Sequence, residues 1–530
     1  MPAENSSGWT GSLDGGAFDS ALPLFGPLSY SQITASFIAA ALVASFIYRI
    51  SFSPIRHVPG PFLAKFTRLW HIYTILAGKQ NLKLVELHKK HGHFVRISHD
   101  EVSVSHPNAI KALYLNPIPK GNWYRVFVFP DWRFPLSMSI QDPKKKADFM
   151  RYLSNAGFSL TNILQREPDM DEQITLLLGW IDKYAAGDEP MALDKFLTYI
   201  AFDVVGIVTF SASFGFVRSG RDVGGAIRSA ARLQLYMCTV GFYPWLSYLL
   251  SNPLVTWTEL MPVGLLATKS ARALEARRAN PDASFDMCSH WYKGLRKAER
   301  DGYAGFKERH VMAAAVSNVG AGTETVSCGL QSCIYHLLRQ PTEWQRVRDE
   351  IDAARKQGRC QSEVVSYEDA SRLPRLEAAI KEGLRMLPPV PMGLPRVVPE
   401  GGVTIGDTTF SKGTTLSVNP SVMHLSKEIW GPDAEEFNPD RWFSPDIAKK
   451  ERYFMPMWCS RAENEQWSAG WASCPGQHLA KVQFFKIIAT IVRDYDLSLV
   501  NPEKEWEWAA YFTVIPRNWP VHVNKRDVPA

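Results

Sequence analysis

A cysteine near the carboxyl-terminal end of the chain lies in a setting that suits metal ligation. A small polar run leads into Cys474, and Pro475 after it is typical of a first helical position. Free N–H groups and the dipole at a helix start stabilise a thiolate. Gly470 and Gly476 leave room for a flat ligand beside the backbone. Cys474 is therefore a candidate thiolate ligand, of the kind that pushes electron density onto haem iron.

Two other interpretations of this cysteine stay open from the residues alone. A buried structural cysteine is one, because a lone Cys-Pro-Gly has little specificity. A zinc site that uses Cys474 and His478 is the other, although only these two ligands have a plausible spacing.

A second segment combines a hydroxyl and a carboxyl inside an apolar helix predicted over residues 307–340. Gly320 and Gly322 each cost that helix about 1 kcal/mol relative to alanine. Glu324 is expensive to bury unless it is used, and Thr325 follows it directly. The pair suits proton transfer, whereas an ordinary amphipathic helix is the simpler alternative.

A third group consists of charged residues between these two segments. Glu382 and Arg385 lie at i and i+3 on one predicted helix, which is also a common surface arrangement. Arg441 follows later in the run Phe437-Asn438-Pro439-Asp440-Arg441-Trp442.

Taken together, these motifs resemble those of the cytochrome P-450 family, in the family's order. The haem-binding loop Phe-x-x-Gly-x-Arg-x-Cys-x-Gly matches at Gly470, Cys474 and Gly476. Two positions depart from it: Trp467 replaces the Phe, and Ala472 replaces the Arg that would pair with a haem propionate. The resemblance implies that Cys474 is the axial iron ligand.

The resemblance also implies roles for the remaining residues. The segment from Ala321 to Thr325 is similar to the oxygen-activation motif, with Val326 in place of its last hydroxyl, so Glu324 and Thr325 would deliver protons. Arg396 occupies the place of a propionate ligand. Arg151 resembles the Arg of Trp-x-x-x-Arg, with Ala147 where the Trp would be. The resemblance further implies that Glu382, Arg385 and Arg441 form a structural triad.

The implied activity is hydroxylation or another oxidation of an apolar small molecule, with haem b as cofactor. Microsomal members take electrons from an NADPH-dependent flavoprotein reductase, with cytochrome b5 as a further donor. Lys144-Lys145-Lys146 is either a solvated charge run or part of the docking surface. The departures in the loop resemble those found in fungal enzymes of secondary-metabolite biosynthesis. A haem-dependent isomerase or dehydratase and a membrane haem sensor are the alternatives.

The amino-terminal segment predicts a membrane anchor. Residues 30–48 are uncharged and long enough to cross about 30 Å of hydrocarbon. Basic residues follow the segment, beginning at Arg49, so the positive-inside rule keeps the rest cytoplasmic. We expect a single-pass protein of the endoplasmic reticulum; a buried core helix is the alternative. Asn5 begins a glycosylation sequon on the lumenal side.

The expected fold is mainly α with a small β-sheet, as a haem domain behind one transmembrane helix. The expected parts are a lumenal tail (1–29), an anchor (30–50), a basic, proline-rich hinge (51–63) and a single haem domain (64–530). Besides the helix over residues 307–340, periodicity predicts helices over 82–92, 192–211, 341–357, 374–387 and 475–494. Alternation predicts strands over 396–398, 403–405, 414–418 and 512–515.

Composition excludes some other classes of protein. The 530 residues carry a net charge of +6 that is spread along the chain, so no nucleic-acid partner is expected. Seven cysteines at irregular spacing argue against a disulfide framework. By position in the family, substrate contacts fall at 120–140, 312–325, 389–396 and 511–516. The aromatic residues of the first range favour a fairly large apolar substrate.

Overall fold

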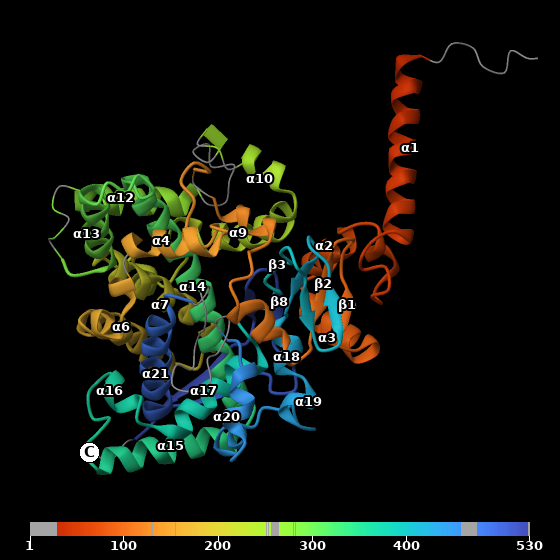
Figure 1. Cartoon of the computed structure of the whole chain (residues 1–530). Helices are drawn as coiled ribbons and strands as arrows, with labels where there is room; N and C mark the ends of the chain where they lie inside the picture. The colour runs from red at the N-terminus through yellow and green to blue at the C-terminus, as the bar shows by residue number, and fades with distance from the viewer. Residues whose placement is uncertain are drawn as a thin grey trace, which may run out of the picture. The chain divides into compact units, whose positions relative to one another are not determined.

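A computed structural model describes most of the chain (Figure 1). The described residues are 29–128, 131–153, 155–250, 252, 254–255, 264–278, 280, 282, 284–456 and 474–527. They fall into two compact units, Met1–Ser53 and Pro54–Ala530. The expected division of the larger unit at residue 63 is not tested by this boundary.

The first unit contains one helix, α1 (Tyr30–Ser51), which is capped by Ser29 and Gln32 in a reciprocal capping box. Its mean hydropathy of 1.8 and its length are sufficient for a membrane span. None of its residues is buried, which does not fit the alternative of a core helix.

The second unit is mainly helical, as expected, and each predicted helix is present with ends within a few residues. Its longer helices are α2 (Leu69–Leu76), α3 (Gln80–His91), α4 (Pro143–Leu153), α6 (Glu167–Ala185), α7 (Leu193–Phe210), α9 (Ala226–Thr239), α12 (Gly264–Arg278), α13 (Met287–Arg300), α14 (Glu308–Leu338), α15 (Pro341–Lys356), α17 (Pro374–Met386) and α21 (Gln477–Asp494). The shorter ones are α5 (Leu160–Leu164), α8 (Phe216–Ser219), α10 (Pro244–Leu250), α16 (Tyr367–Ala370), α18 (Pro420–His424), α19 (Lys427–Trp430) and α20 (Ile447–Lys450).

The strands are short and form small sheets. A four-stranded sheet has the order β1 (Phe94–Arg96), β2 (Glu101–Val104), β6 (Thr415–Ser417), β3 (Arg396–Val397), with β2 and β6 parallel. Three antiparallel pairs join β4 (Val403–Ile405) to β5 (Thr408–Phe410), β7 (Tyr495–Leu499) to β10 (Val521–Lys525), and β8 (Glu507–Ala510) to β9 (Val514–Arg517).

The strand expected at 512–515 is displaced: β9 begins at Val514, and Thr513 belongs to the turn that precedes it. The carbonyl of Thr513 accepts from the N–H of Tyr511 at 3.0 Å, which closes this turn. The Thr513 side chain makes a buried contact with Glu324. The alternation of residue types therefore did not predict where the strand begins.

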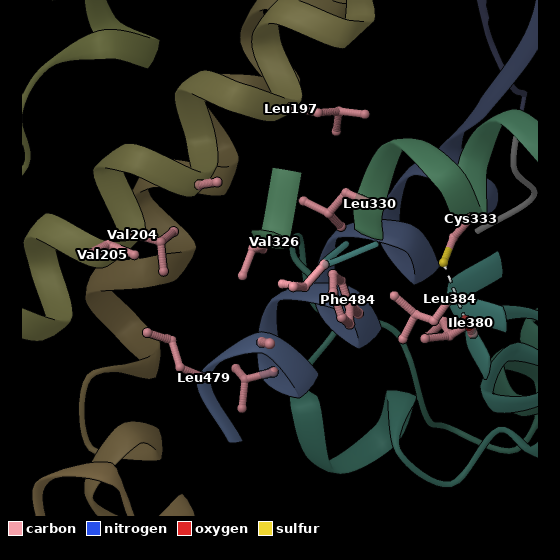
Figure 2. Close-up of a cluster of buried hydrophobic side chains, with 14 of the residues drawn as sticks. Leu197, Val204, Val205, Val326, Leu330, Cys333, Ile380, Leu384, Leu479 and Phe484 are labelled. Carbon is pink, nitrogen blue, oxygen red and sulfur yellow. Dashed lines mark hydrogen bonds between the residues drawn. The ribbon is translucent and has the colours of Figure 1, made fainter. Parts of the chain in front are cut away.

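The core is built around α14, which packs against α7, α17 and α21. Figure 2 shows Val326 and Leu330 of α14 among Val204 and Val205 of α7 and Phe484 of α21. All five side chains are buried in one hydrophobic cluster. The residues that position the site therefore sit on helices held on several sides.

Glycines permit the closest approaches of these helices. A Cβ on Gly329 of α14 would lie 2.5 Å from the ring of Phe484, and one on Gly383 of α17 would lie 2.7 Å from the sulfur of Cys333. Larger residues would force α14 away from both neighbours.

Candidate active site

Cys474 lies just before α21, at a cavity whose opposite wall is α14. The cavity is lined by Cys474, Pro475 and Gly476 from the loop and by Ala321, Gly322 and Thr325 from α14, together with Leu136, Ser137, Leu153, Phe158, Trp291, Ala314, Ser317, Asn318, Val326, Leu479 and Ala480. The loop and the helix thus bring the two predicted chemical segments face to face.

The helix after Cys474 begins later than expected. Pro475 and Gly476 form a turn, Gly476 is the N-cap, and α21 starts at Gln477. The prediction that Pro475 is the first helical residue is wrong, because a turn at Pro475 and Gly476 precedes the helix.

Opposing influences act on the thiol of Cys474. Burial raises its pKa, whereas the backbone N–H of Gly476 and the cation of Lys146 lower it. The donor and the cation are features that favour a thiolate, as expected for a metal ligand.

Thr325 faces this cavity from one turn above Ala321. Its hydroxyl donates to the Ala321 carbonyl at 2.6 Å. The helix runs unbroken through this point. The two glycines beside it differ: a Cβ on Gly322 would meet Val205 of α7 at 2.9 Å, whereas one on Gly320 would meet nothing within 4 Å.

Glu324 points to a different side of α14 and is buried. Its carboxylate accepts hydrogen bonds from the Gln234 amide of α9 and, at 3.0 Å, from the Thr513 hydroxyl. Burial raises the pKa of Glu324 to about 7, and these two hydrogen bonds act in the opposite direction. A carboxyl with this pKa can both give and take a proton near neutral pH.

Three buried cations gather beside the cavity: Arg396, Lys120 and Lys146. Backbone pairing brings the first two together, since Lys120 and Arg396 form an antiparallel bridge. Arg396 donates to the Tyr124 hydroxyl at 2.9 Å, and Lys120 donates to the carbonyl of Ser137, a cavity residue, at 3.3 Å.

These cations oppose one another electrostatically. Burial and the charges of Lys146 and Arg396 hold the pKa of Lys120 well below its ordinary value. Burial and Arg396 lower the pKa of Lys146 to about 8, while Cys474 acts to raise it. A bound dianion would relieve this repulsion, so the cluster fits the two carboxylates of haem.

Lys146 corrects two expectations about α4. The lysine run is not uniformly solvated, because Lys146 is buried while Lys144 and Lys145 are exposed. Arg151, the expected propionate ligand of this helix, is exposed, so Lys146 replaces it as the candidate. The signal was present: Lys146 shares helical spacing with the buried Phe149 and Leu153.

The Glu382, Arg385 and Arg441 side chains meet in the interior, which excludes a surface pair. Glu382 accepts from Arg385 at 2.8 and 2.9 Å and from Arg441 at 2.8 Å. The indole of Trp442 donates to the same carboxylate at 2.9 Å. Arg385 also donates to the carbonyl of His424 at 2.6 Å, so the group ties α17 to the segment that leads toward the Cys474 loop.

Part of the predicted loop cannot be placed. Trp467, Gly470 and Ala472 lie outside the described residues. Within the described part of the chain, no cluster of three or more His, Cys, Asp or Glu side chains could hold a metal ion.

The aromatic residues expected at the substrate site are partly core. Trp123 and Phe127 are buried and pack against Phe512 with ring centroids 5.5 and 5.4 Å apart. Trp132 is exposed. The packing of Trp123 and Phe127 against Phe512 joins two of the predicted substrate regions, 120–140 and 511–516, which lie far apart in the sequence.

The amino-acid sequence of the chain is similar to those of known proteins. The family model for Cytochrome P450 matches residues 59–518. Cytochrome P450 monooxygenase cicH of Emericella nidulans is 27% identical over 93% of this chain and 98% of its own length. Pisatin demethylase of Fusarium vanettenii is 28% identical over 92% of each chain. Cytochrome P450 monooxygenase gsfF of Penicillium aethiopicum is 28% identical over 89% of this chain and 94% of its own length.

Cys474, just before α21, and Thr325 of the long helix α14 line one cavity in a mainly helical unit. The chain belongs to the cytochrome P450 family, and it is an oxygen-incorporating oxidoreductase with a haem-iron cofactor. Its monooxygenase relatives favour this conclusion over the isomerase and sensor alternatives.

Proposed function

We propose that this monooxygenase oxidises an apolar small molecule of fungal secondary metabolism, with Cys474 as the axial ligand of haem b. The observation that carries the proposal is the shared cavity of Cys474 and Thr325. The overall reaction takes one O2, two electrons and two protons, places one oxygen atom in the substrate and releases the other as water. When bound, haem supplies the iron at which dioxygen is reduced.

The propionates of the haem are held, in this proposal, by Arg396, Lys120 and Lys146. Charge-assisted hydrogen bonds from these buried cations replace the contact that Ala472 cannot make. Gly470, Gly476, Trp467 and Ala321 remain proposed haem-binding residues, and Trp467 and Gly470 lie outside the described residues.

Glu324 and Thr325 manage protons in the proposed mechanism. Thr325 holds a hydroxyl at the cavity wall, where it donates to the Ala321 carbonyl. In the proposal the hydroxyl turns from that carbonyl and donates to an oxygen or a water placed in the cavity. Glu324 restores that proton, because its raised pKa of about 7 keeps part of its population protonated at neutral pH.

The substrate class follows from the walls of the cavity and of the aromatic cluster. Phe158, Trp291 and Leu479 line the cavity. The cluster of Trp123, Phe127 and Phe512 joins the predicted contact regions 120–140 and 511–516. Such walls favour an apolar molecule with few polar groups.

The remaining proposals concern the location of the protein in the cell and its electron donors. Helix α1 is proposed as a single-pass anchor in the endoplasmic reticulum, with residues 1–29 lumenal, 51–63 as a hinge and 64–530 cytoplasmic. Electrons would come from NADPH through a flavoprotein reductase, with cytochrome b5 as a second donor. The exposed Lys144, Lys145 and Arg151 of α4 offer a basic face for an acidic flavoprotein.

The test of the ligand is the spectrum of the reduced protein with carbon monoxide. Wild type should show the strongly red-shifted Soret band of thiolate ligation, and Cys474→Ala should lose it. Cys288→Ala, a matched control at a buried cysteine of α13, should keep the band. A thiolate-type spectrum in Cys474→Ala would contradict the assignment.

A further inference from the structure

The Glu324 carboxyl is part of a closed ring of hydrogen bonds. Gln234 and Thr513 both donate to the same carboxylate oxygen, Oε2. The backbone N–H of Thr513 in turn donates to the Gln234 side-chain oxygen at 3.1 Å. All three residues are buried, so water competes little for these bonds.

The hydrogen-bonded ring joins α14 to α9 and to the turn before β9, and both of these elements contact the aromatic cluster. Phe512, the neighbour of Thr513, packs on Trp123 and Phe127. Trp123 donates from its indole to the carbonyl of Met237 at 2.9 Å, on the same helix as Gln234. The elements that hold the carboxyl therefore also shape the proposed substrate wall.

The charges around Glu324 are few among the described residues. The thiol of Cys328, one turn further along α14, interacts electrostatically with Glu324. Burial raises the pKa of that thiol above its ordinary range. From α9 and the β8–β9 turn the facing groups are the uncharged Gln234 and Thr513. From α7, Val205 packs at this level against Gly322. Hydrogen bonds, rather than ion pairs, thus oppose the effect of burial.

We propose that Gln234 and Thr513 are positioning residues that hold the Glu324 carboxyl and set the pH at which it releases its proton during oxygen reduction. The inference rests on the proposed function. Consecutive helical positions point about 100° apart, so Glu324 faces the ring while Thr325 faces the cavity. The carboxyl must leave the ring, or act through water, to supply Thr325. The strength of the ring therefore decides how readily it acts.

The experiment is an infrared titration of the haem-loaded full-length protein. The C=O band of a protonated buried carboxyl is followed from about pH 5 to about pH 9, and the band missing in Glu324→Gln is assigned to Glu324. In wild type we expect a midpoint near neutral pH. Thr513→Val keeps the shape but removes the hydroxyl that stabilises the ionised form, so the midpoint should rise by about one pH unit.

Thr513→Ser is the matched control, because it keeps the hydroxyl and should keep the wild-type midpoint. Gln234→Met removes the amide donor at similar length, and it should also raise the midpoint; it serves as a second variant where Thr513→Val does not fold with haem. An unchanged midpoint in the folded variants, or a shift in Thr513→Ser as large as in Thr513→Val, would overturn the proposal.

A second readout connects the ring to turnover. With reductase and NADPH, the peroxide formed per NADPH consumed is measured against pH. In Thr513→Val, the pH dependence of the peroxide formed per NADPH should shift to higher pH together with the infrared midpoint. A purely structural defect would instead change the amount of peroxide per NADPH equally at all pH values. If the infrared shift is present but wild type consumes no oxygen, the proposed monooxygenase function is contradicted. The effect of Gln234 and Thr513 on the Glu324 carboxyl would still stand in that case.

Discussion

At the scale of single residues, Lys146 and Lys120 are the least expected features. A lysine so deeply buried loses hydration that is worth several kcal/mol, and here each also faces the charge of Arg396. In the proposed mode of haem binding, an anionic group beside the Cys474 cavity would offset that cost. The same loop lacks the usual arginine, since Ala472 takes its place.

Lys146→Met is predicted to weaken haem retention. Loss of one charge-assisted hydrogen bond should speed haem transfer to excess apomyoglobin roughly ten- to hundredfold. Lys146→Arg should retain most of the affinity. Lys145→Met, on the exposed side of the same helix, should transfer haem at the wild-type rate; equal loss in both methionine variants would mean that only general stability had changed.

Thr325→Ala is predicted to uncouple electron flow from oxidation. The hydroxyl at the cavity wall is lost, so the proportion of electrons that end in peroxide should rise, and product per NADPH should fall roughly tenfold or more. Haem content and binding of apolar ligands should stay near wild type. The measurement is NADPH, peroxide and product in one assay, with Thr325→Ser expected to stay coupled. Full coupling in Thr325→Ala would place the proton path elsewhere.

At the scale of elements, the group formed by Glu382, Arg385 and Arg441 holds α17 to the segment before the Cys474 loop. The three charged side chains of this group are buried, and several hydrogen bonds join them to one another and to the backbone. Removing one member would leave its partners buried and unbalanced, which is costlier than losing a surface pair. The role is structural, since these residues do not line the cavity.

Arg441→Met is predicted to lower the free energy of unfolding by about 3–5 kcal/mol, because the Glu382 charge loses a partner in the interior. Denaturant unfolding followed by circular dichroism measures the change. Glu368→Gln breaks the exposed i,i+4 pair with Arg372, and it should change stability by no more than about 0.5 kcal/mol. Similar effects from the two substitutions would show that the buried group contributes little.

At the scale of the whole molecule, the chain divides into an apolar helix and a large folded unit. Helix α1 has no buried residue, so its removal takes no side chain out of a core. The long-range contacts described for the site all lie within Pro54–Ala530.

Deletion of residues 1–50 is therefore predicted to leave a unit that folds, binds haem and keeps the thiolate-type carbon monoxide spectrum. Fractionation of cells should show less of it in membranes than the full chain. Some association is expected to remain, because large apolar side chains such as Tyr73 and Trp245 are exposed on this unit. Loss of haem binding by a truncated protein that is well folded would contradict a purely anchoring role.

The amino-acid sequence by itself determined the features that depend on neighbours along the chain. Helical periodicity predicted α14 and α21, and the order of local motifs identified Cys474, Glu324 and Thr325 as candidates. The family and the fold class followed from that order and are confirmed. Such features can be predicted because residues a few positions apart have fixed relative directions in a helix.

Tertiary structure alone decided which distant residues meet. Gln234 and Thr513 reach Glu324 from α9 and from a turn near the end of the chain, and Lys120 reaches Arg396 through backbone pairing. No spacing in the sequence encodes these contacts, since they depend on how whole elements pack. The pKa of a buried group depends on the same packing, because burial and its hydrogen-bond partners set the balance between its charged and neutral forms.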